Sequence, residues 1–592
     1  MADNTTSNTI PPLRRFFRLL RPDSKEIVYI YFYALLAGLV TLTLPLGVQA
    51  VIGLILGGEI STSLVILIAI VTLGNLFSGF LKIMQLTVTE VIQRRLFTRS
   101  SYELSVRIPR LRTDLLQDEY PPELVNRFFD TITIQKGLPK ILIDFSTAAL
   151  QILFGLILLA FYHPLFIFFG LILLLLLSVI LRLTSPAGLR TSLQESKFKY
   201  KVVYWLQEVA RAMSTFKLAG NSRLPIRHTD KLANGYLDAR AAHFKVLINQ
   251  YWFIVLFQAI VTGMLLSLGS WLVINNLISI GQFVASEIVI ILIVGSVEKI
   301  ISSMETIYDT LTGVEKLGQV TDLELENESG LSFTKVDNGK GIELELQDLN
   351  VYYPQLKRPV LNGVNLKIAS GERICIAGYN SAGKSTLARV IAALHLDYKG
   401  AVAYNGVPMG NFCIPSLRSY IGEFTSQEDI FRGSLIENIC LGHEDVHFKE
   451  VQWAAEAVGL GNFVRNLPEG YNTMLLPGGR TLPQSIRSRI ILARCIVSRP
   501  RLLAMEDFLN QIDPSDRLRI IQTLSDRNHT WTFVAVSDDP LLARHCDRII
   551  LLDAGEVVGQ GSYDEMENDP RFREIFKLSE ADQQAGFSYY SR

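Results

Sequence analysis

The sequence has no excess charge of either sign and few cysteines, and each shortage excludes a class of protein. Its 592 residues include 57 lysines and arginines and 57 aspartates and glutamates, whereas a nucleic-acid-binding protein of this size is usually basic. The 5 cysteines fit the spacing of neither a zinc site nor a redox pair. They are Cys375, Cys413, Cys440, Cys495 and Cys546. We therefore expect no nucleic-acid partner. All five cysteines fall in the second half of the chain, for which we expect a reduced cytoplasmic compartment.

Charged side chains are rarest in the first half of the chain, where long apolar runs predict membrane-spanning helices. About 20 apolar residues in a helix cross the ~30 Å hydrocarbon core of a bilayer. The run PLFIFFGLILLLLLSVIL has no polar face, so a core helix of a soluble protein explains it poorly. Six spans in a lipid bilayer are expected, at residues 27–58, 60–81, 145–162, 164–181, 251–274 and 282–301.

The distribution of lysine and arginine predicts which loops face the cytoplasm. These residues gather before the first span, between the second and third spans and between the fourth and fifth, and the opposite loops contain none. Positively charged loops stay cytoplasmic. Both termini are therefore expected on the cytoplasmic side of a bacterial inner or plasma membrane. The expected parts are a cytoplasmic segment 1–26, a membrane domain 27–320 whose spans continue as cytoplasmic helices, a linker 321–341 and a soluble domain 342–592.

The strongest motif is a phosphate-binding loop in the segment RICIAGYNSAGKSTLARVIAAL. An apolar strand precedes Gly378 and an apolar helix opens at Lys384, which is the context that the motif G-x-x-x-x-G-K-S requires. Backbone N–H groups of such a loop face the phosphates, the lysine contacts the β- and γ-phosphates, and the serine hydroxyl binds Mg²⁺. The expected nucleotide-binding residues are Gly378, Tyr379, Asn380, Ser381, Ala382, Gly383, Lys384, Ser385 and Thr386.

Six spans followed by this loop resemble an ABC exporter half-transporter, over almost the whole chain. The resemblance implies an α-helical polytopic membrane domain of the type 1 exporter arrangement, fused to a cytoplasmic α/β P-loop NTPase cassette that binds ATP and Mg²⁺. VYYP is similar to the family's adenine-stacking loop, with Tyr353 as the ring, and GEFTSQEDIFRGSLIENI to its glutamine loop, with Gln427 near the metal. PELVNRFFDTI is similar to the first coupling segment, with Pro122 at a usual glycine. The membrane half is most similar to exporters of the peptide and protein secretion branch.

The family signature L-S-G-G-Q is replaced here by Leu482 followed by Pro483, Gln484, Ser485 and Ile486. The usual serine and glycines offer a hydroxyl and backbone N–H groups to the γ-phosphate held by the partner subunit. Proline has no N–H to donate, and Gln484 and Ser485 place side chains where the backbone must approach closely. We therefore expect a damaged contribution to the partner's site.

The strand end LAMEDFLNQID carries two carboxylates in the reverse of the family order. Glu506 stands where the metal-binding aspartate is usual, so the expected metal ligands are Ser385, Gln427 and Glu506. Asp507 replaces the catalytic glutamate as a candidate base one methylene shorter, and displacements of ~1 Å can cost ~100-fold in rate. The alternative interpretation is that both acids are merely solvated at the end of a strand. The spacing of 7 residues from Glu506 to a further aspartate disfavours this alternative. Ser537 replaces the switch histidine of the family and has no titratable ring.

These motifs leave three functions open. The chain can be the ATP-binding half of an exporter of a peptide, protein or amphiphile, in a heterodimer with a second, competent chain. It can instead be an active homodimeric ABC exporter ATPase, or a nucleotide-gated membrane scaffold or regulator that transports nothing. The groups that bind nucleotide remain, whereas those that hydrolyse it are altered at three places. This combination favours the heterodimer with a weak or non-hydrolytic site.

Glu287, Gln151 and Gln258 are three of the polar residues inside the predicted spans. Glu287 lies in the sixth apolar run, and an intramembrane acid can line a transport pathway. Its place 5 residues after Gln282 favours a position near the outer interface instead. Gln151 and Gln258 are expected to form hydrogen bonds between helices.

Overall fold

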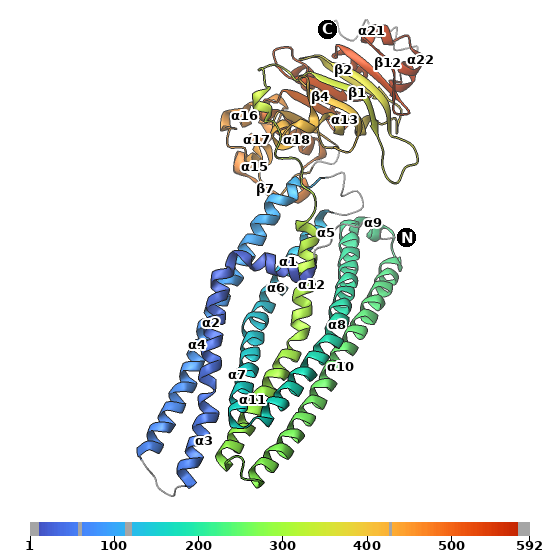
Figure 1. The fold of residues 1–592 in the computed structure, drawn as a ribbon. Helices are drawn as coiled ribbons and strands as arrows, with labels where there is room; N and C mark the ends of the chain where they lie inside the picture. The colour runs from blue at the N-terminus through green and yellow to red at the C-terminus, as the bar shows by residue number, and fades with distance from the viewer. Residues whose placement is uncertain (1–10, 57–61, 113–120, 426–428, 578–592) are drawn as a thin grey trace. The chain divides into compact units, whose positions relative to one another are not determined.

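The computed structural model describes residues 11–56, 62–112, 121–425 and 429–577. Contacts between Cα atoms divide the chain into two compact units. The first comprises Met1–Pro109 and Glu119–Leu323, and the second comprises Arg110–Asp118 and Glu324–Arg592. Figure 1 shows the first unit in blue to yellow-green and the second mainly in yellow to red.

The first unit is built from long apolar helices. Among the described residues, 6 helical segments have the length and composition to cross a membrane, which confirms the number of predicted spans. They are Pro12–Ile55, Thr62–Arg110, Glu123–Tyr162, Leu165–Arg211, Leu224–Ile274 and Ile280–Thr321.

The first of these segments contains three helices rather than one. A short helix, α1 (Pro12–Leu20), precedes α2 (Ser24–Thr41) and α3 (Thr43–Leu56). Pro45 lies in the first turn of α3, where a proline is tolerated because the N–H groups have no intrahelical partner. The break therefore falls where the sequence places a proline inside the first apolar run.

Three helices of the first unit are much longer than a membrane span. The remaining helices are α4 (Thr62–Arg107), α5 (Pro121–Asn126), α6 (Asp130–Pro139), the π-helical stretch η5 (Lys140–Phe145), α7 (Ser146–Tyr162), α8 (Leu165–Arg211), α9 (Met213–Leu218), α10 (Leu224–Ile274), α11 (Ile280–Ser302) and α12 (Met304–Thr321). α4, α8 and α10 contain 46, 47 and 51 residues. Since about 20 residues cross the hydrocarbon core, each of the three continues well beyond it.

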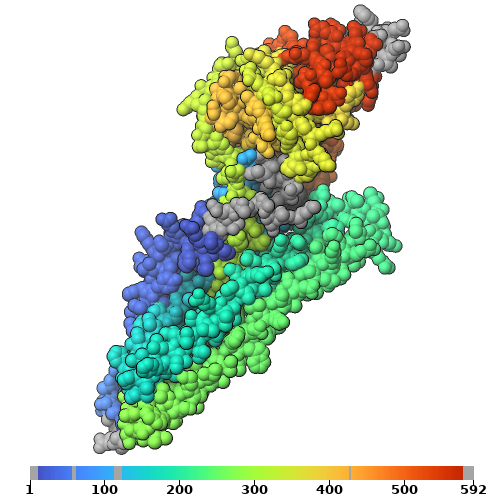
Figure 2. All heavy atoms as spheres, turned by 45° about the vertical axis from the view of Figure 1, so that its right-hand side comes forward, coloured from blue at the N-terminus to red at the C-terminus, as the bar shows by residue number. Residues whose placement is uncertain are grey.

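α8 and α10 pack against each other, and Figure 2 shows them side by side in teal and green. In their polar parts, Nδ1 of His243 lies 2.8 Å from the Thr191 hydroxyl. Arg240 forms an ion pair with Glu195 at 3.4 Å. These pairs align the two helices where an apolar interface alone would leave their register less defined.

The two membrane glutamines form hydrogen bonds between helices, as predicted. The Ser296 hydroxyl in α11 donates to Oε1 of Gln151 in α7 at 2.9 Å. Nε2 of Gln258 in α10 donates to Oε2 of Glu298 in α11 at 3.0 Å. Glu287 is half-buried and lies about 10 Å along α11 from its start, at ~1.5 Å per residue. Its role in a pathway stays a prediction.

The described residues of the second unit form three β-sheets. The largest has 6 strands in the order β12-β11-β3-β10-β9-β6, and its neighbours are parallel except for β11 and β12. Its strands are β3 (Arg373–Gly378), β6 (Ile421–Phe424), β9 (Leu502–Glu506), β10 (Thr532–Val536), β11 (Arg548–Asp553) and β12 (Glu556–Gly561). The antiparallel sheet β2-β1-β4-β5 and the pair β7-β8 consist of β1 (Leu344–Val351), β2 (Leu361–Ile368), β4 (Lys399–Tyr404), β5 (Val407–Pro408), β7 (Gly433–Ser434) and β8 (Met474–Leu475).

Helices connect these strands in the α/β pattern predicted for the cassette. They are α13 (Lys384–Ile391), α14 (Ile414–Arg418), α15 (Leu435–Cys440), α16 (Phe448–Ala457), α17 (Gly461–Arg465), α18 (Gln484–Val497), α19 (Pro514–Leu524), α20 (Pro540–Arg544), α21 (Tyr563–Met566) and α22 (Pro570–Ile575). Every residue of β3, β9 and β10 is buried, as expected for parallel strands covered on both faces. The carboxyl ends of these three strands meet at one edge, where α/β proteins bind ligands.

Candidate nucleotide site

The phosphate loop joins β3 to α13. Neighbouring backbone atoms leave no room for a side chain at two of its glycines. A Cβ on Gly378 would lie 2.1 Å from the carbonyl oxygen of Leu552, and one on Gly383 would lie 2.7 Å from that of Val360. Gly383 also has a φ of 100°, in the left-handed region that favours glycine. The loop therefore has the compact curve in which backbone N–H groups can surround a phosphate.

Lys384 closes this loop. Its Nζ donates to the carbonyl oxygens of Gly378 at 2.6 Å and Tyr379 at 2.9 Å. The Tyr379 hydroxyl donates to Oε2 of Glu574 at 2.6 Å, so the outer part of the loop is tied to α22. Ser385 is exposed at the start of α13, where the helix dipole adds partial positive charge. These positions suit a bound triphosphate and a metal ion at the hydroxyl.

Tyr353, the predicted adenine-stacking residue, lies beside α13. Its hydroxyl is 3.5 Å from the hydroxyl oxygen of Thr386, and its ring centroid lies 5.5 Å from that of His395. The neighbouring Tyr352 is more exposed, and the Lys399 ammonium lies 5.1 Å from its ring centroid. The geometry thus brings Tyr353 to the phosphate loop, and its stacking role stays a prediction.

The two predicted carboxylates lie at the end of β9. Glu506 is buried and pairs in the sheet with Val536 of β10. Asp507 is exposed and has a φ of 48°, a left-handed conformation in which aspartate is over-represented among residues other than glycine. Its N–H donates to the carbonyl oxygen of Val536 at 3.0 Å. The backbone of Asp507 is therefore fixed by β10, while its carboxylate remains accessible.

The pKa of Asp507 is raised above that of an ordinary aspartate. Loss of hydration is the main cause, the carboxylates of Asp538 and Glu506 add to it, and Lys384 opposes it. Asp538 was not among the predicted site residues, although the letters SDDP place it directly after Ser537. The raised pKa by itself makes the ionised carboxylate a stronger base, so the weakness expected of Asp507 rests on its shorter side chain.

Ser537 lies at the end of β10, at the predicted switch position. Its hydroxyl oxygen accepts the N–H of Asp539 at 3.1 Å, and its own N–H donates to the carbonyl oxygen of Ile376 at 3.2 Å. Its side chain is buried, with 4% of the residue exposed. A hydroxyl held in its own turn provides neither the reach nor the charge of a histidine.

The signature position opens α18. Pro483 is the N-cap residue and forms no side-chain hydrogen bond to the helix, whereas serine at this place usually caps the free N–H groups. Gln484 is exposed, and Ser485 and Ile486 are half-buried. The proline offers no hydrogen-bond donor at this helix start, and the role of the four residues toward a partner's nucleotide stays a prediction.

Sequence reasoning missed Gln511, which connects this helix to the acid pair. Oε1 of Gln511 accepts hydrogen bonds from the side chains of Gln484 and Ser488. In the same turn, Asp513 forms an ion pair with Arg489 of α18 at 3.2 Å. No periodicity marks Gln511 in the sequence, and only its place between the acids and Asp513 could have drawn attention to it.

The donor set for Mg²⁺ is small. Among the described residues, no three histidine, cysteine, aspartate or glutamate side chains are grouped closely enough to hold a metal ion. A Mg²⁺ ion usually keeps several waters and is bound by one or two protein groups together with substrate phosphates, and Ser385 and Glu506 fit that pattern. The third predicted ligand, Gln427, lies outside the described residues.

Comparisons with known proteins cover both units. The ABC transporter family matches residues 361–510, and the ABC transporter transmembrane region matches residues 27–297. The first match contains the phosphate loop and the acid pair, and the second begins at the first predicted span.

Curated relatives include toxin-export proteins. The alpha-hemolysin translocation ATP-binding protein HlyB of Escherichia coli O157:H7 is 27% identical over 376 residues, which are 63% of this chain and 53% of that protein. The leukotoxin export ATP-binding protein LtxB of Aggregatibacter actinomycetemcomitans is 28% identical over 372 residues, 62% of this chain and 52% of that protein. The chain thus spans about half the length of these relatives.

Among solved structures, a bacterial Atm1-family ABC exporter with ATP bound has the same fold. The TM-score is 0.78 at 18% identity, and the superposition covers 94% of this chain and 99% of that chain. The apolar helices, the two family matches and the fold comparison therefore indicate the same kind of protein. The chain belongs to the ABC transporter family, as a multi-pass membrane protein with the exporter fold and a cytoplasmic ATP-binding cassette.

Proposed function

We propose that this chain is the ATP-binding half of an exporter that pairs with a different, competent chain and contributes a weak or non-hydrolytic nucleotide site. The observation that carries the proposal is the start of α18, where Pro483 replaces a hydrogen-bond donor. The phosphate loop keeps its glycines and Lys384. Binding groups are thus retained while a group directed at the partner's nucleotide is lost.

Pairing determines how much these changes cost. Cassettes of this family are expected to work head to tail, so each composite site takes its phosphate loop and acids from one chain and its signature from the other. In a homodimer both sites would combine Pro483 with Asp507 and Ser537. In a heterodimer, one site combines the partner's intact loop and acids with the altered signature of this chain. The other site combines this chain's altered acids and switch residue with the partner's intact signature. The heterodimer therefore leaves one site with a complete set of acids.

We further propose that the cargo is a peptide or protein that leaves the cytoplasm. Two relatives are described as proteins of toxin translocation and export, and the layout of spans fused to a cassette is that of an exporter. Deleting the chain from its host and comparing the secreted proteome with that of a strain carrying Lys384→Ala tests this cargo. The same polypeptide should disappear from the medium in both strains.

ATP turnover of the purified chain, alone and with any copurifying partner, tests the proposed pairing. The lone chain should bind ATP with Mg²⁺ and hydrolyse it far more slowly than the ~1–100 s⁻¹ common for phosphoryl-transfer enzymes. Turnover should rise when the partner is present. Ordinary turnover by the lone chain would establish an active homodimer instead. ATP binding with neither turnover nor a partner would point to a nucleotide-gated scaffold.

A further inference from the structure

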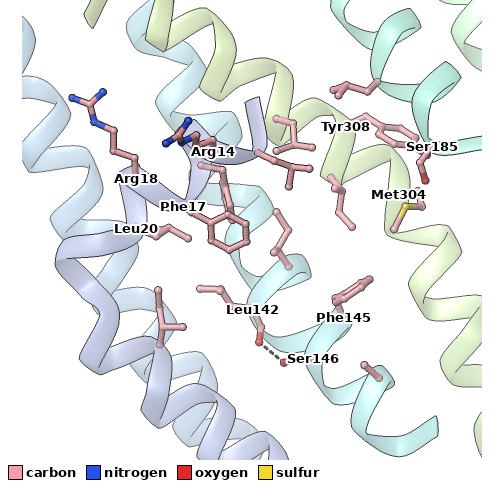
Figure 3. Close-up of a pocket in the computed structure, with 18 of the residues that line it drawn as sticks. Arg14, Phe17, Arg18, Leu20, Leu142, Phe145, Ser146, Ser185, Met304 and Tyr308 are labelled. Atoms are coloured by element: carbon pink, nitrogen blue, oxygen red, sulfur yellow. Dashed lines mark hydrogen bonds between the residues drawn. The ribbon is translucent and has the colours of Figure 1, made fainter. Parts of the chain in front are cut away.

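The first unit contains a large apolar cavity bounded by α1, α2, η5, α7, α8 and α12. Its volume is about 1540 Å³, larger than the ~300–1,000 Å³ of most small-molecule pockets. Figure 3 shows the side chains of Phe17, Leu142, Phe145 and Met304 around it. A space of this size and lining suits hydrocarbon chains.

α1 forms a fixed wall of this cavity. Arg15 anchors the helix to α12 through ion pairs with Glu315 at 3.0 Å and Asp322 at 2.8 Å. Phe16 is buried, whereas Phe17 is 67% exposed and its ring is directed into the cavity (Figure 3). An aromatic ring held by a fixed helix at an open apolar space provides a contact surface for an apolar ligand.

The edge of the cavity is positively charged. Arg14, Arg18 and Arg21 contribute to the lining, are exposed and form no ion pair with any described residue, and no carboxylate is among the described residues that line the cavity. Figure 3 shows the guanidinium groups of Arg14 and Arg18 at the α1 side, away from the apolar interior. All three precede the first span, at the cytoplasmic interface, where anionic lipid headgroups attract arginine.

Another wall of the cavity is formed by η5, the π-helical stretch. Such stretches are rare inside α-helices and occur frequently at functional sites. The Ser146 hydroxyl that follows η5 donates to the carbonyl oxygen of Leu142, a bond drawn in Figure 3. This internal bond satisfies the hydroxyl, so this part of the wall presents mainly apolar side chains, among them Ile141 and Phe145.

We propose that this cavity binds one anionic phospholipid of the cytoplasmic leaflet. The lipid phosphate contacts Arg14, Arg18 and Arg21, and the acyl chains lie against Phe17 and Phe145. The arrangement pairs free positive charge with a deep apolar space, and a phospholipid has both complementary parts. The proposal is separate from the proposed pairing and from ATP hydrolysis, because every residue in it belongs to the first unit.

Native mass spectrometry of the full chain in mild detergent tests the site, with dioleoyl phosphatidylglycerol and dioleoyl phosphatidylcholine as probes. One phosphatidylglycerol should be retained per chain, at least ~10-fold more tightly than phosphatidylcholine, because each interfacial arginine contributes about five-fold. The triple variant Arg14→Gln, Arg18→Gln and Arg21→Gln should lose this preference. A matched control, Lys217→Gln, Arg223→Gln and Arg227→Gln, removes three exposed charges from the α9–α10 region and should keep it.

A second variant keeps the test decisive if the arginine variant does not fold. Ala149→Trp fills the cavity from α7 and should weaken retention of phosphatidylglycerol at least ~10-fold while the arginines remain. Glycerol phosphate, which has no acyl chains, should not compete. Equal retention of both lipids by the unaltered chain, unchanged retention by either variant, or competition by glycerol phosphate would overturn the proposal. Loss of the lipid on dimerisation would also overturn it, since a second copy would then cover the cavity.

Discussion

The hydroxyl of Ser488 donates a hydrogen bond of 2.9 Å to Oε1 of Gln511. This bond joins α18, which opens at the signature position, to the turn that follows the acid pair. Gln511 lies four residues after Asp507 in the chain. One hydrogen bond and a short stretch of backbone therefore connect the helix of the predicted signature position with the predicted base.

Removing this connection should loosen the start of α18. Ser488→Ala deletes one hydrogen bond of a side chain that is 2% exposed, which should lower the free energy of unfolding of the second unit by about 1 kcal/mol. Denaturant unfolding of the full chain, followed by the fluorescence of Trp531 and Trp453 in the cassette, measures the change. Ser498→Ala, at the exposed C-terminal end of the same helix, is the control and should change stability by less than ~0.5 kcal/mol.

Lys384→Ala should abolish most nucleotide affinity. The ammonium lies at the centre of the phosphate loop, and a hydrogen bond to a charged group contributes about 1.5–3 kcal/mol, so the Kd of ATP should rise ~10- to 100-fold. Equilibrium binding of a fluorescent ATP analogue checks this. Lys449→Ala, on the exposed surface of α16, should leave the Kd unchanged. If Lys384→Ala bound as tightly as the original chain, the loop would not be the nucleotide site.

Restoring family residues should recover hydrolysis only when a signature set and a site set of substitutions are combined. The signature set is Pro483→Ser, Gln484→Gly, Ser485→Gly and Ile486→Gln, and the site set is Asp507→Glu and Ser537→His. In the lone chain, either set by itself should leave ATP turnover within ~10-fold of that of the unaltered chain. The reason is that the effects of groups that act as a unit on the rate are strongly non-additive. Both sets together should raise turnover at least ~100-fold.

An ATPase assay of the three variants at saturating ATP decides this prediction. Recovery from the signature set alone would show that Asp507 and Ser537 already suffice for hydrolysis. That result would replace the heterodimer with the active homodimer.

The raised pKa of Asp507 predicts a pH dependence with a definite sign. Since Asp538 helps to raise that pKa, Asp538→Asn should lower it and keep Asp507 ionised to lower pH. If residual turnover needs the ionised form, its acid limb should move to lower pH in this variant. Turnover of the chain with its partner, measured across pH, tests the shift.

Asp564→Asn, at an exposed position of α21, is the control for charge and should leave the acid limb in place. No movement of the limb in Asp538→Asn would mean that Asp507 is not the titrating base. A shift to higher pH would contradict the cause assigned to the raised pKa.

Much of the fold and the ligand-binding part of the site could be predicted because each depends on a local pattern. Long apolar runs predicted six membrane spans, and the described part of the chain has six apolar helical segments of sufficient length. The break between α2 and α3 was not predicted, because the apolar run continues through Pro45 without a change in composition. The phosphate loop was found from its spacing, whereas the reason for a glycine at position 378, the close carbonyl oxygen of Leu552, exists only in the folded chain.

The sequence by itself determined the membrane spans, the phosphate loop and the altered hydrolytic positions, since periodicity, composition and spacing are properties of neighbouring residues. Only the tertiary structure decided that Gln511 bonds Ser488, that Asp538 acts on Asp507, and that arginines of α1 border an apolar cavity. These contacts join residues that are distant along the chain, and they form only when strands and helices pack. Local pattern thus identifies the nucleotide-binding chain, and packing decides how its altered groups act on one another.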